Sequence, residues 1–327
     1  NRLRVILEPT DNTQNVSLRA LSILNVNNLS INHLTISALK LTLNELMLSL
    51  NGFRNLTYLT LINCQIDSID SVHLDGIDQL KSLDLSQNLI ASIRSVRFKG
   101  IEKLMSLNLS SNRIESIDLV ELVGVENLIH LDLKLNQIRS VSMCTFRGVP
   151  MLVELSLQGN RIESRLDRVE FSGLSNLANL FLHKNHINHF NISVVNLRGL
   201  NKLRLLDLSI NNISFDSRVE FVNLTELRVL RLAALTHLNG SLNVTFVGLE
   251  SNLVQLDLSY NFFTRFDLIQ IEGLKSLQRI ILNQNRFVSI EHPIRVETTS
   301  KTLFMFIYPH TNYNFLNVVD TYFDYIR

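Results

Sequence analysis

At 327 residues the chain is long enough for two or three ordinary domains or for one array of repeats. Its 31 basic and 30 acidic residues give a formal net charge of +1, which excludes a strong field for nucleic acid or for an anionic membrane. Although 46% of the residues are hydrophobic, no run approaches the roughly 20 consecutive apolar residues of a membrane span. We therefore expect no nucleic-acid partner and no membrane insertion by this segment.

The chain opens with a stretch in which no repeat can be set in register. Residues 1–30 lack a clear pattern, whereas Ile31, Leu34 and Ile36 begin a first repeat. An array of stacked repeats must cover its end with a polar outer face. We therefore predict an N-terminal cap or degenerate repeat over 1–30 and the repeat array over 31–300.

Within the array one phrase recurs, written L-x-x-L-x-L-x-x-N-x-I. Its second apolar position falls at residues 59, 83, 107, 131, 155, 180, 206, 230, 256 and 280, a period of 24 to 26 residues. The alternating L-x-L predicts a short strand with one buried face, which a single repeat cannot bury alone. Phrase and period resemble the extracellular class of the leucine-rich-repeat family. The resemblance implies an α/β solenoid, a horseshoe with a parallel β-sheet on the concave face and mostly irregular convex segments.

Three further positions keep the same period. Large apolar residues are expected to form a spine behind the strands: Leu50, Leu74, Phe98, Leu122, Phe146, Phe171, Leu197, Phe221, Phe246 and Ile271. A glycine usually follows two residues later, which predicts a backbone conformation that other residues resist. The asparagine of the phrase is expected to satisfy backbone groups of its own turn and the neighbouring one. Cys64 and Leu235 replace it in two repeats, where we expect looser turns.

Side chains that flank the buried leucines face the concave side, where we predict a protein-binding surface. Along its central row, short and mostly acidic side chains are interrupted by Phe181, and a large exposed aromatic is typical of an interface anchor. The predicted partner-binding residues are Asp84, His130, Asp132, Lys134, Glu154, Phe181, His183, Asp207 and Arg231. The alternative is a merely solvated face on which neighbouring side chains cover Phe181.

The C-terminal residues 301–327 hold eight of the chain's 23 aromatic residues. We predict a last strand and a cap there, because an open sheet edge is sticky. A dimerisation surface is the alternative.

Residues of catalytic type form no known motif. No phosphate-binding glycine loop, nucleophile elbow or HExxH sequence occurs, so we expect no enzymatic activity and no cofactor. His183, His186 and His189 lie close in sequence, but the repeat register spreads them along a turning chain, whereas zinc needs three or four ligands around one point. We expect solvated side chains, with a metal site as the alternative.

Cysteines and glycosylation triplets bear on the compartment. Cys64 is expected to be buried and inert, and Cys144 lies too many strands away to bond with it, which predicts a free thiol or an intermolecular disulfide at Cys144. Nine N-x-S/T triplets, more than composition alone predicts, favour a secretory route. The candidate glycosylation sites are Asn55, Asn191, Asn212, Asn239 and Asn243.

Together these patterns predict a non-enzymatic, secreted or extracellular protein-binding module. The resemblance to receptor ectodomains and to secreted insect immune proteins suggests innate immune recognition or immune-complex assembly, with a protein partner in a homo- or heterodimer. Two other functions fit the same sequence: a cell-adhesion or developmental receptor ectodomain, and an intracellular enzyme-inhibitor scaffold.

Overall fold

The structure, a computed structural model, describes residues 31–37, 46–50, 53–238, 240–288, 295–296, 298–300 and 303–306. The predicted N-terminal cap and most of the aromatic C-terminal segment lie outside these residues. The chain divides into two compact units. Unit 1 comprises residues 1–161 and 171–177, and unit 2 comprises residues 162–170 and 178–327.

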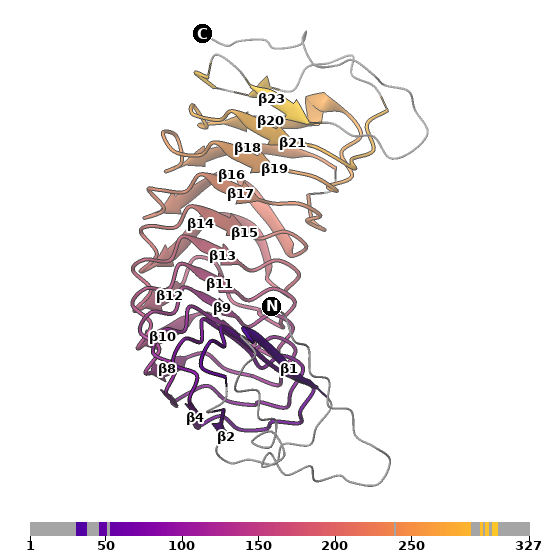
Figure 1. Cartoon of the computed structure of the whole chain (residues 1–327). Coiled ribbons are helices and arrows are strands. Elements are labelled where there is room, and N and C mark those ends of the chain that lie inside the picture. Colours follow the sequence, from indigo (N-terminus) through magenta and orange to yellow (C-terminus); the bar gives the residue numbers. More distant parts are fainter. Residues whose placement is uncertain are drawn as a thin grey trace. The chain divides into compact units, whose positions relative to one another are not determined.

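Each unit is a parallel β-solenoid whose turns contribute one strand to each of two sheets (Figure 1). The first sheet, predicted as the concave one, contains the L-x-L strands. In unit 1 these are β1 (His33–Ser37), β3 (Tyr58–Ile62), β5 (Ser82–Asp84), β7 (Ser106–Asn108), β9 (His130–Asp132) and β11 (Glu154–Ser156). In unit 2 they are β13 (Asn179–Phe181), β15 (Leu205–Asp207), β17 (Val229–Arg231), β19 (Gln255–Asp257), β21 (Arg279–Ile281) and β23 (Phe304–Phe306). The predicted solenoid with a parallel sheet is confirmed.

The register of this first sheet follows the repeat. Leu107 of β7 pairs with Leu83 of β5 and with Leu131 of β9, so that equivalent residues of successive turns lie side by side. All three leucines are at most 1% exposed. Stacking therefore produces the continuous core that a single repeat lacks.

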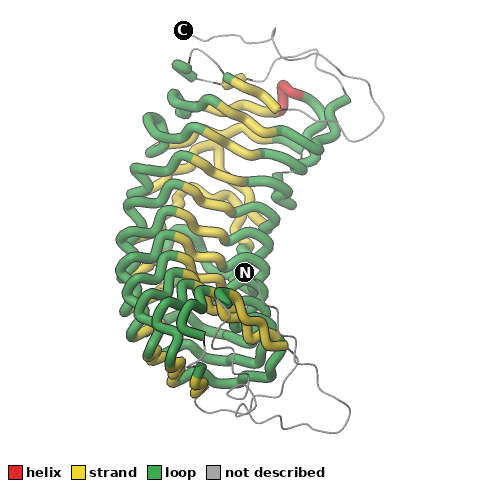
Figure 2. The backbone as a smooth tube through the Cα atoms, viewed as in Figure 1, coloured by secondary structure: helices red, strands yellow, loops and turns green. Residues whose placement is uncertain are grey.

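The second sheet occupies the segments that were expected to be mostly irregular. Its strands are β2 (Leu46–Ser49), β4 (Ser71–Asp75), β6 (Val96–Lys99), β8 (Leu119–Val123) and β10 (Met143–Arg147) in unit 1, and β14 (Asn188–Arg198), β16 (Asn212–Val222), β18 (Leu242–Val247), β20 (Ile269–Glu272) and β22 (Arg295–Val296) in unit 2. A further strand, β12 (Val169–Ser172), has residues in both units. Loops join the strands, and in the described part of the chain the helical content is one short 3-10 segment, η2 (Phe266–Leu268), red in Figure 2.

The second sheet forms because the spine residues belong to strands. Phe98 in β6 is 3% exposed, and Val96, two residues earlier, is fully buried. Val120 and Leu122 of β8 repeat this alternation. Side chains two apart lie on the same face of a strand, so the valine and the spine residue enter the core together. Because buried apolar residues recur every second position in this segment, it forms a strand rather than an irregular loop.

The glycine after each spine residue has the special conformation that the sequence predicts. Gly148 has φ +80°, and a Cβ atom added to it would lie 1.9 Å from the backbone oxygen of Leu122 in the preceding turn. A side chain there would meet backbone rather than a movable neighbour. The position therefore keeps successive second-sheet turns in close contact.

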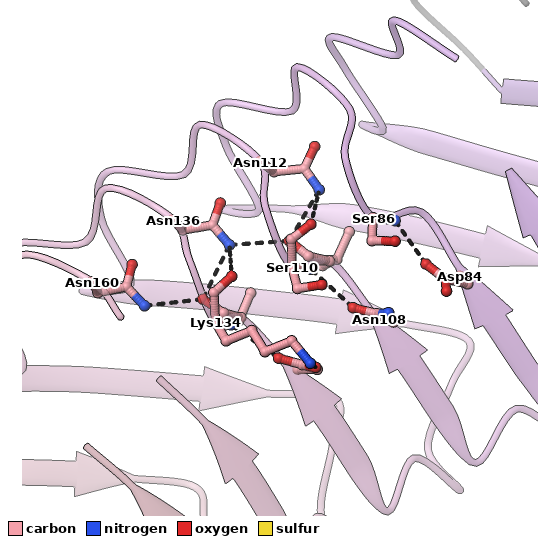
Figure 3. A network of polar contacts seen from close by, with 11 residues as sticks. Asp84, Ser86, Asn108, Ser110, Asn112, Lys134, Asn136 and Asn160 are labelled. Atoms are coloured by element: carbon pink, nitrogen blue, oxygen red, sulfur yellow. Dashed lines mark hydrogen bonds and ion pairs between the residues drawn. The ribbon is translucent and has the colours of Figure 1, made fainter. Parts of the chain in front are cut away.

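The asparagines form the predicted ladder (Figure 3). The amide nitrogen of Asn136 donates to the carbonyls of Leu133 and Lys134 in its own turn, at 3.0 and 3.3 Å, and to Leu109 of the preceding turn, at 3.0 Å. Its Oδ1 accepts the N–H of Ile114, also in the preceding turn, at 3.0 Å. One buried amide thus satisfies backbone groups of two turns.

The turns at Cys64 and Leu235 keep one hydrogen bond of the ladder. The N–H of Cys64 still donates to Asn88 Oδ1 at 2.8 Å, and the N–H of Leu235 donates to Asn261 Oδ1 at 2.8 Å. Each of these acceptors is supplied by the following turn, so replacing an asparagine leaves its own backbone N–H satisfied. The Cys64 thiol also donates to Ile62 at 3.4 Å, a weak substitute for the amide.

Candidate functional site

The acidic row at the end of the first-sheet strands has a structural role in both units. Asp84 Oδ1 accepts the N–H of Ser86 at 2.8 Å, and Asn108 Oδ1 accepts that of Ser110 at 3.0 Å (Figure 3). The same bond, from the residue two positions on, is made to Asp132, Asp207 and Asp257. A short side chain that accepts this bond turns the backbone out of the strand. Oδ1 of each carboxylate therefore stabilises the turn, and only Oδ2 is available for contacts with other side chains or with a partner.

In unit 1 four of the predicted binding residues lie in two pairs. His130 Nδ1 lies 3.8 Å from Glu154 Oε2, and Lys134 Nζ lies 3.0 Å from Asp132 Oδ2. Side-chain exposure in these pairs ranges from 25% to 51%, so solvent screens them and each pair stabilises the fold little. Asp84, the remaining predicted residue of this unit, is half-buried and serves as the acceptor described above.

In unit 2 the predicted residues converge on one buried carboxylate. Asp207 is 5% exposed, and its Oδ2 lies 3.3 Å from His183 Nδ1 and 3.4 Å from Arg231 Nη1. His183 and Arg231 come from the adjoining turns on either side of Asp207, and their side chains are 30% and 37% exposed. Asp207 is thus a positioning group, and its two neighbours are the groups that solvent reaches.

The protonation of Asp207 reflects two opposing influences. Burial raises the pKa of this carboxyl, but the interactions with His183 and with Ser209 outweigh it, so that the pKa is lowered from its usual 3.8. Asp207 is therefore ionised at neutral pH. A buried carboxylate of this kind holds cationic and donor side chains in a fixed arrangement.

Phe181 is less prominent than the sequence suggests. It is half-buried, and its ring meets that of His183 edge to face with centroids 6.4 Å apart. The phenyl ring therefore packs against the imidazole and helps to orient it. Phe181, His183, Asp207 and Arg231 form one surface, which we call the Asp207 cluster.

Comparison with known proteins assigns the repeats. A family profile described as Leucine rich repeat matches residues 54–114 and 102–162. Residues 54–162 therefore match leucine-rich repeats. No curated protein sequence matches it.

Three solved structures are similar to this chain. One is the APL1 leucine-rich-repeat domain, with 17% identity, coverage of 93% of this chain and 82% of that chain, and a TM-score of 0.41. Another is an internalin of Listeria monocytogenes, with 17% identity, 84% and 85% coverage and a TM-score of 0.32. The third is a leucine-rich-repeat protein of Leptospira interrogans, with 19% identity, 83% and 82% coverage and a TM-score of 0.36.

Cys64 and Cys144 are both buried, and no disulfide joins them. Cys144 in β10 is 2% exposed, and burial, with a smaller contribution from Asp118, raises the pKa of its thiol to about 12. A buried neutral thiol is a poor nucleophile. Of the two alternatives that we predicted for Cys144, a free thiol or an intermolecular disulfide, its burial favours the free thiol.

The glycosylation triplets differ in accessibility. Asn191 in β14 and Asn243 in β18 are exposed on the second sheet, and Asn55 is exposed just before β3. Asn212 is half-buried and donates to Asn188 Oδ1 at 3.1 Å. The fifth candidate, Asn239, lies outside the described residues.

The described residues form neither a metal-binding cluster nor a membrane-spanning helix. Within the described ranges, no three or more His, Cys, Asp or Glu side chains are grouped so that they could hold a metal ion. His183 belongs to the Asp207 cluster and His186 is exposed, while the side chain of His189 is not described. Among the described residues there is also no helix with the length and apolar character needed to cross a membrane.

Sequence reasoning missed one solvent-facing feature of unit 2. The residue before each ladder asparagine has a left-handed backbone, and in unit 2 this position holds bulky apolar side chains at Ile210 and Tyr260, 49% and 53% exposed. Phe262, just after the asparagine of the same turn, is also left-handed and 50% exposed. The x positions of the repeat phrase could have revealed this feature. A β-branched or aromatic residue is unusual at a position with a left-handed backbone, where glycine, asparagine or glutamine is expected.

Proposed function

We propose that this leucine-rich-repeat chain is a non-enzymatic extracellular module that binds a protein partner through the Asp207 cluster of unit 2. The observation that carries the proposal is the arrangement of Phe181, His183 and Arg231 around one buried carboxylate. Arginine and aromatic side chains contribute most of the binding energy in many protein interfaces. Here the carboxylate and the neighbouring ring restrict their rotamers before binding, which lowers the entropy lost on association.

The chemistry of the cluster specifies what the partner offers. Asp207 Oδ2 already serves both neighbours, so the exposed edges of the Arg231 guanidinium and the His183 imidazole remain as donors. A partner carboxylate or amide oxygen fits these donors, and an apolar side chain fits the half-buried Phe181 ring. The partner is a protein chain, and a second copy of this molecule in a homodimer is included in the proposal.

The secretory route is supported by where the triplets lie. Asn191 and Asn243 are exposed in second-sheet strands, while the first-sheet strands of unit 2 carry no N-x-S/T triplet. Glycans at these two residues would leave the Asp207 cluster uncovered. An immune role, in recognition or complex assembly, is the biological setting that the repeat class suggests.

Two experiments test the proposal. Protein from a eukaryotic secretory host is expected to lose mass on treatment with a peptide N-glycosidase, and an unchanged mass would remove the secretory part. Partners captured from the native fluid are then titrated against Phe181→Ala and Arg231→Ala, which are expected to weaken binding at least about tenfold with little change in melting temperature. Lys134→Ala in unit 1 is the matched control. Equal affinities for all three variants and the wild type would reject the cluster as the binding site.

A further inference from the structure

A second solvent-facing surface of unit 2 lies where the chain leaves the first-sheet strands. We call the residue before each ladder position, whether that position holds asparagine or its replacement, the exit residue. In this unit the exit residues have φ between +52° and +58°: Lys184, Ile210, Ala234, Tyr260 and Gln284. Backbone bonds link these residues into a row, since Ile210 donates to Ala233 at 2.8 Å and Ala234 donates to Ser259 at 2.9 Å. The exit residues of successive turns are thus neighbours on the surface.

Three side chains in this row and beside it are exposed although they are large and apolar. Ile210, Tyr260 and Phe262 are 49%, 53% and 50% exposed, and all three have left-handed backbones. Residues with a branched or bulky side chain seldom take this conformation, which asparagine and glycine tolerate. Neither core packing nor turn geometry accounts for them, because their side chains point to solvent and the same turn is made elsewhere by polar residues.

Unit 1 provides the comparison within the same chain. Its exit residues, each with the same left-handed backbone, are Asn63, Gln87, Ser111, Leu135 and Gly159. Four of these five are polar or glycine, and Leu135 is the one apolar exception, without an aromatic residue on either side of its ladder asparagine. The fold therefore accepts polar residues at this position, and the apolar set in unit 2 has another cause.

The charged residues next to the ladder positions of unit 2 are basic. Arg286 places its guanidinium carbon 4.5 Å from the centroid of the Phe262 ring, and within the described part of the chain it forms no ion pair. Lys184 and His186 flank the other end of the row and are exposed. Neither position next to a ladder asparagine in unit 2 holds an aspartate or glutamate. A guanidinium fixed over an aromatic ring keeps its N–H edges available for a carboxylate.

We propose that Ile210, Tyr260, Phe262 and Arg286, which we call the exit patch, dock a peptide segment of a partner protein that carries both acidic and apolar side chains. The apolar side chains of the segment cover the exposed rings and the isoleucine, and its carboxylates pair with Arg286 and with the basic end of the row. This surface is formed by strand-exit turns rather than by the face of the first sheet, so the exit patch is a second interaction site, independent of the Asp207 cluster.

The test uses a display library of random short peptides and the whole chain. Wild-type protein is panned in parallel with the triple variant Ile210→Asn, Tyr260→Gln, Phe262→Gln. Each new residue occurs naturally at the same position of another turn, where it has a left-handed backbone: Asn63, Gln87 and Gln65. Peptides that combine Asp or Glu with Leu or aromatic residues are expected to be enriched on the wild type alone. Selected peptides are then measured by fluorescence anisotropy, with a loss of at least about tenfold in affinity expected for the triple variant.

Two controls make the outcome decisive. Leu135→Gln in unit 1 removes an exposed apolar exit residue and is expected to leave peptide affinity unchanged, and Arg286→Gln is expected to lower it and to flatten its dependence on salt. The melting temperature of the triple variant is expected to equal or exceed that of the wild type, because left-handed strain is relieved. A lower melting temperature would make these side chains part of the fold and overturn the proposal. Enrichment of basic or uncharged peptides, or a concentration-dependent dimer that the triple variant abolishes, would overturn the acidic segment as the occupant.

Discussion

Units 1 and 2 are built from the same turn but present different side chains to solvent. Both have buried leucines in the first sheet, a spine in the second and a ladder of asparagines at the strand exits. In unit 1 the polar residues of the strand face lie in partly exposed pairs, such as Lys134 with Asp132. In unit 2 they gather on the buried Asp207, and bulky apolar residues occupy the exit turns. Because the shared positions already hold the turn together, the x positions of the repeat are free to diverge, and they do so differently in the two units.

The largest expected effect tests the core that both units share. Leu131→Asp in unit 1 and Leu230→Asp in unit 2 place a charge at positions that are 1% and 0% exposed. Each is expected to cost roughly 3–5 kcal/mol, because an unpaired buried charge has no compensating partner. Hydrogen exchange on the two variants would locate the loss in the mutated unit. A wild-type exchange pattern in either variant would contradict the register described here.

A somewhat smaller effect is expected at the glycines after the spine. Gly148→Ala in unit 1 and Gly248→Ala in unit 2 each force a Cβ atom against a carbonyl oxygen, at 1.9 and 2.3 Å in the unrelaxed backbone. A loss of about 2–4 kcal/mol is expected in chemical denaturation, from overpacking together with the left-handed backbone. Gly240→Ala is the control, since its Cβ would lie 3.2 Å from the nearest oxygen, and it should lose less than either.

The asparagine ladder should be more tolerant. Asn136→Leu imitates the residue found naturally at Leu235, and the Ile114 N–H then loses its acceptor while three carbonyls lose a donor. We expect a loss of about 1–3 kcal/mol by denaturant titration, because buried backbone groups are left unpaired. The reverse change, Leu235→Asn, should lose less than Asn136→Leu, and the opposite ranking would show that the ladder is not what holds these turns.

The smallest effect is the pH dependence of unit 2. Asp207 has a lowered pKa in the folded chain, so its ionised form stabilises the fold at pH values above the usual 3.8, and this contribution is lost as the pH falls through the lower folded value. Asp207→Asn is expected to reduce stability near neutral pH and to weaken the dependence of melting temperature on pH below about 4. Asp132→Asn in the exposed pair of unit 1 is the control. Identical pH profiles for Asp207→Asn and the wild type would rule out the cluster as an electrostatic unit.

Several features of the site could be predicted and others could not. Leu107 and Asn136 follow from the phrase itself, and the Gly148 conformation follows from its period. The second sheet also has a signal in the sequence, because the apolar residues Val96 and Phe98 are two positions apart, as on one face of a strand. This signal is weak, because only two apolar positions alternate and loop residues flank them. The burial of Cys144 follows from this same alternation, since it lies two residues before the spine residue Phe146.

What the sequence by itself determined about this protein is everything that the period repeats: the solenoid, its buried leucines, the spine, the glycine turn and the asparagine ladder. Those positions meet the same neighbours in every turn, so one copy of the pattern predicts the next. The tertiary structure alone decided how unlike residues in adjoining turns combine. His183, Asp207 and Arg231 are about a repeat apart in sequence, and only stacking brings their side chains together around one carboxylate. The same stacking places Arg286 over Phe262, because a contact between turns depends on the register of two strands and on the rotamers that packing selects.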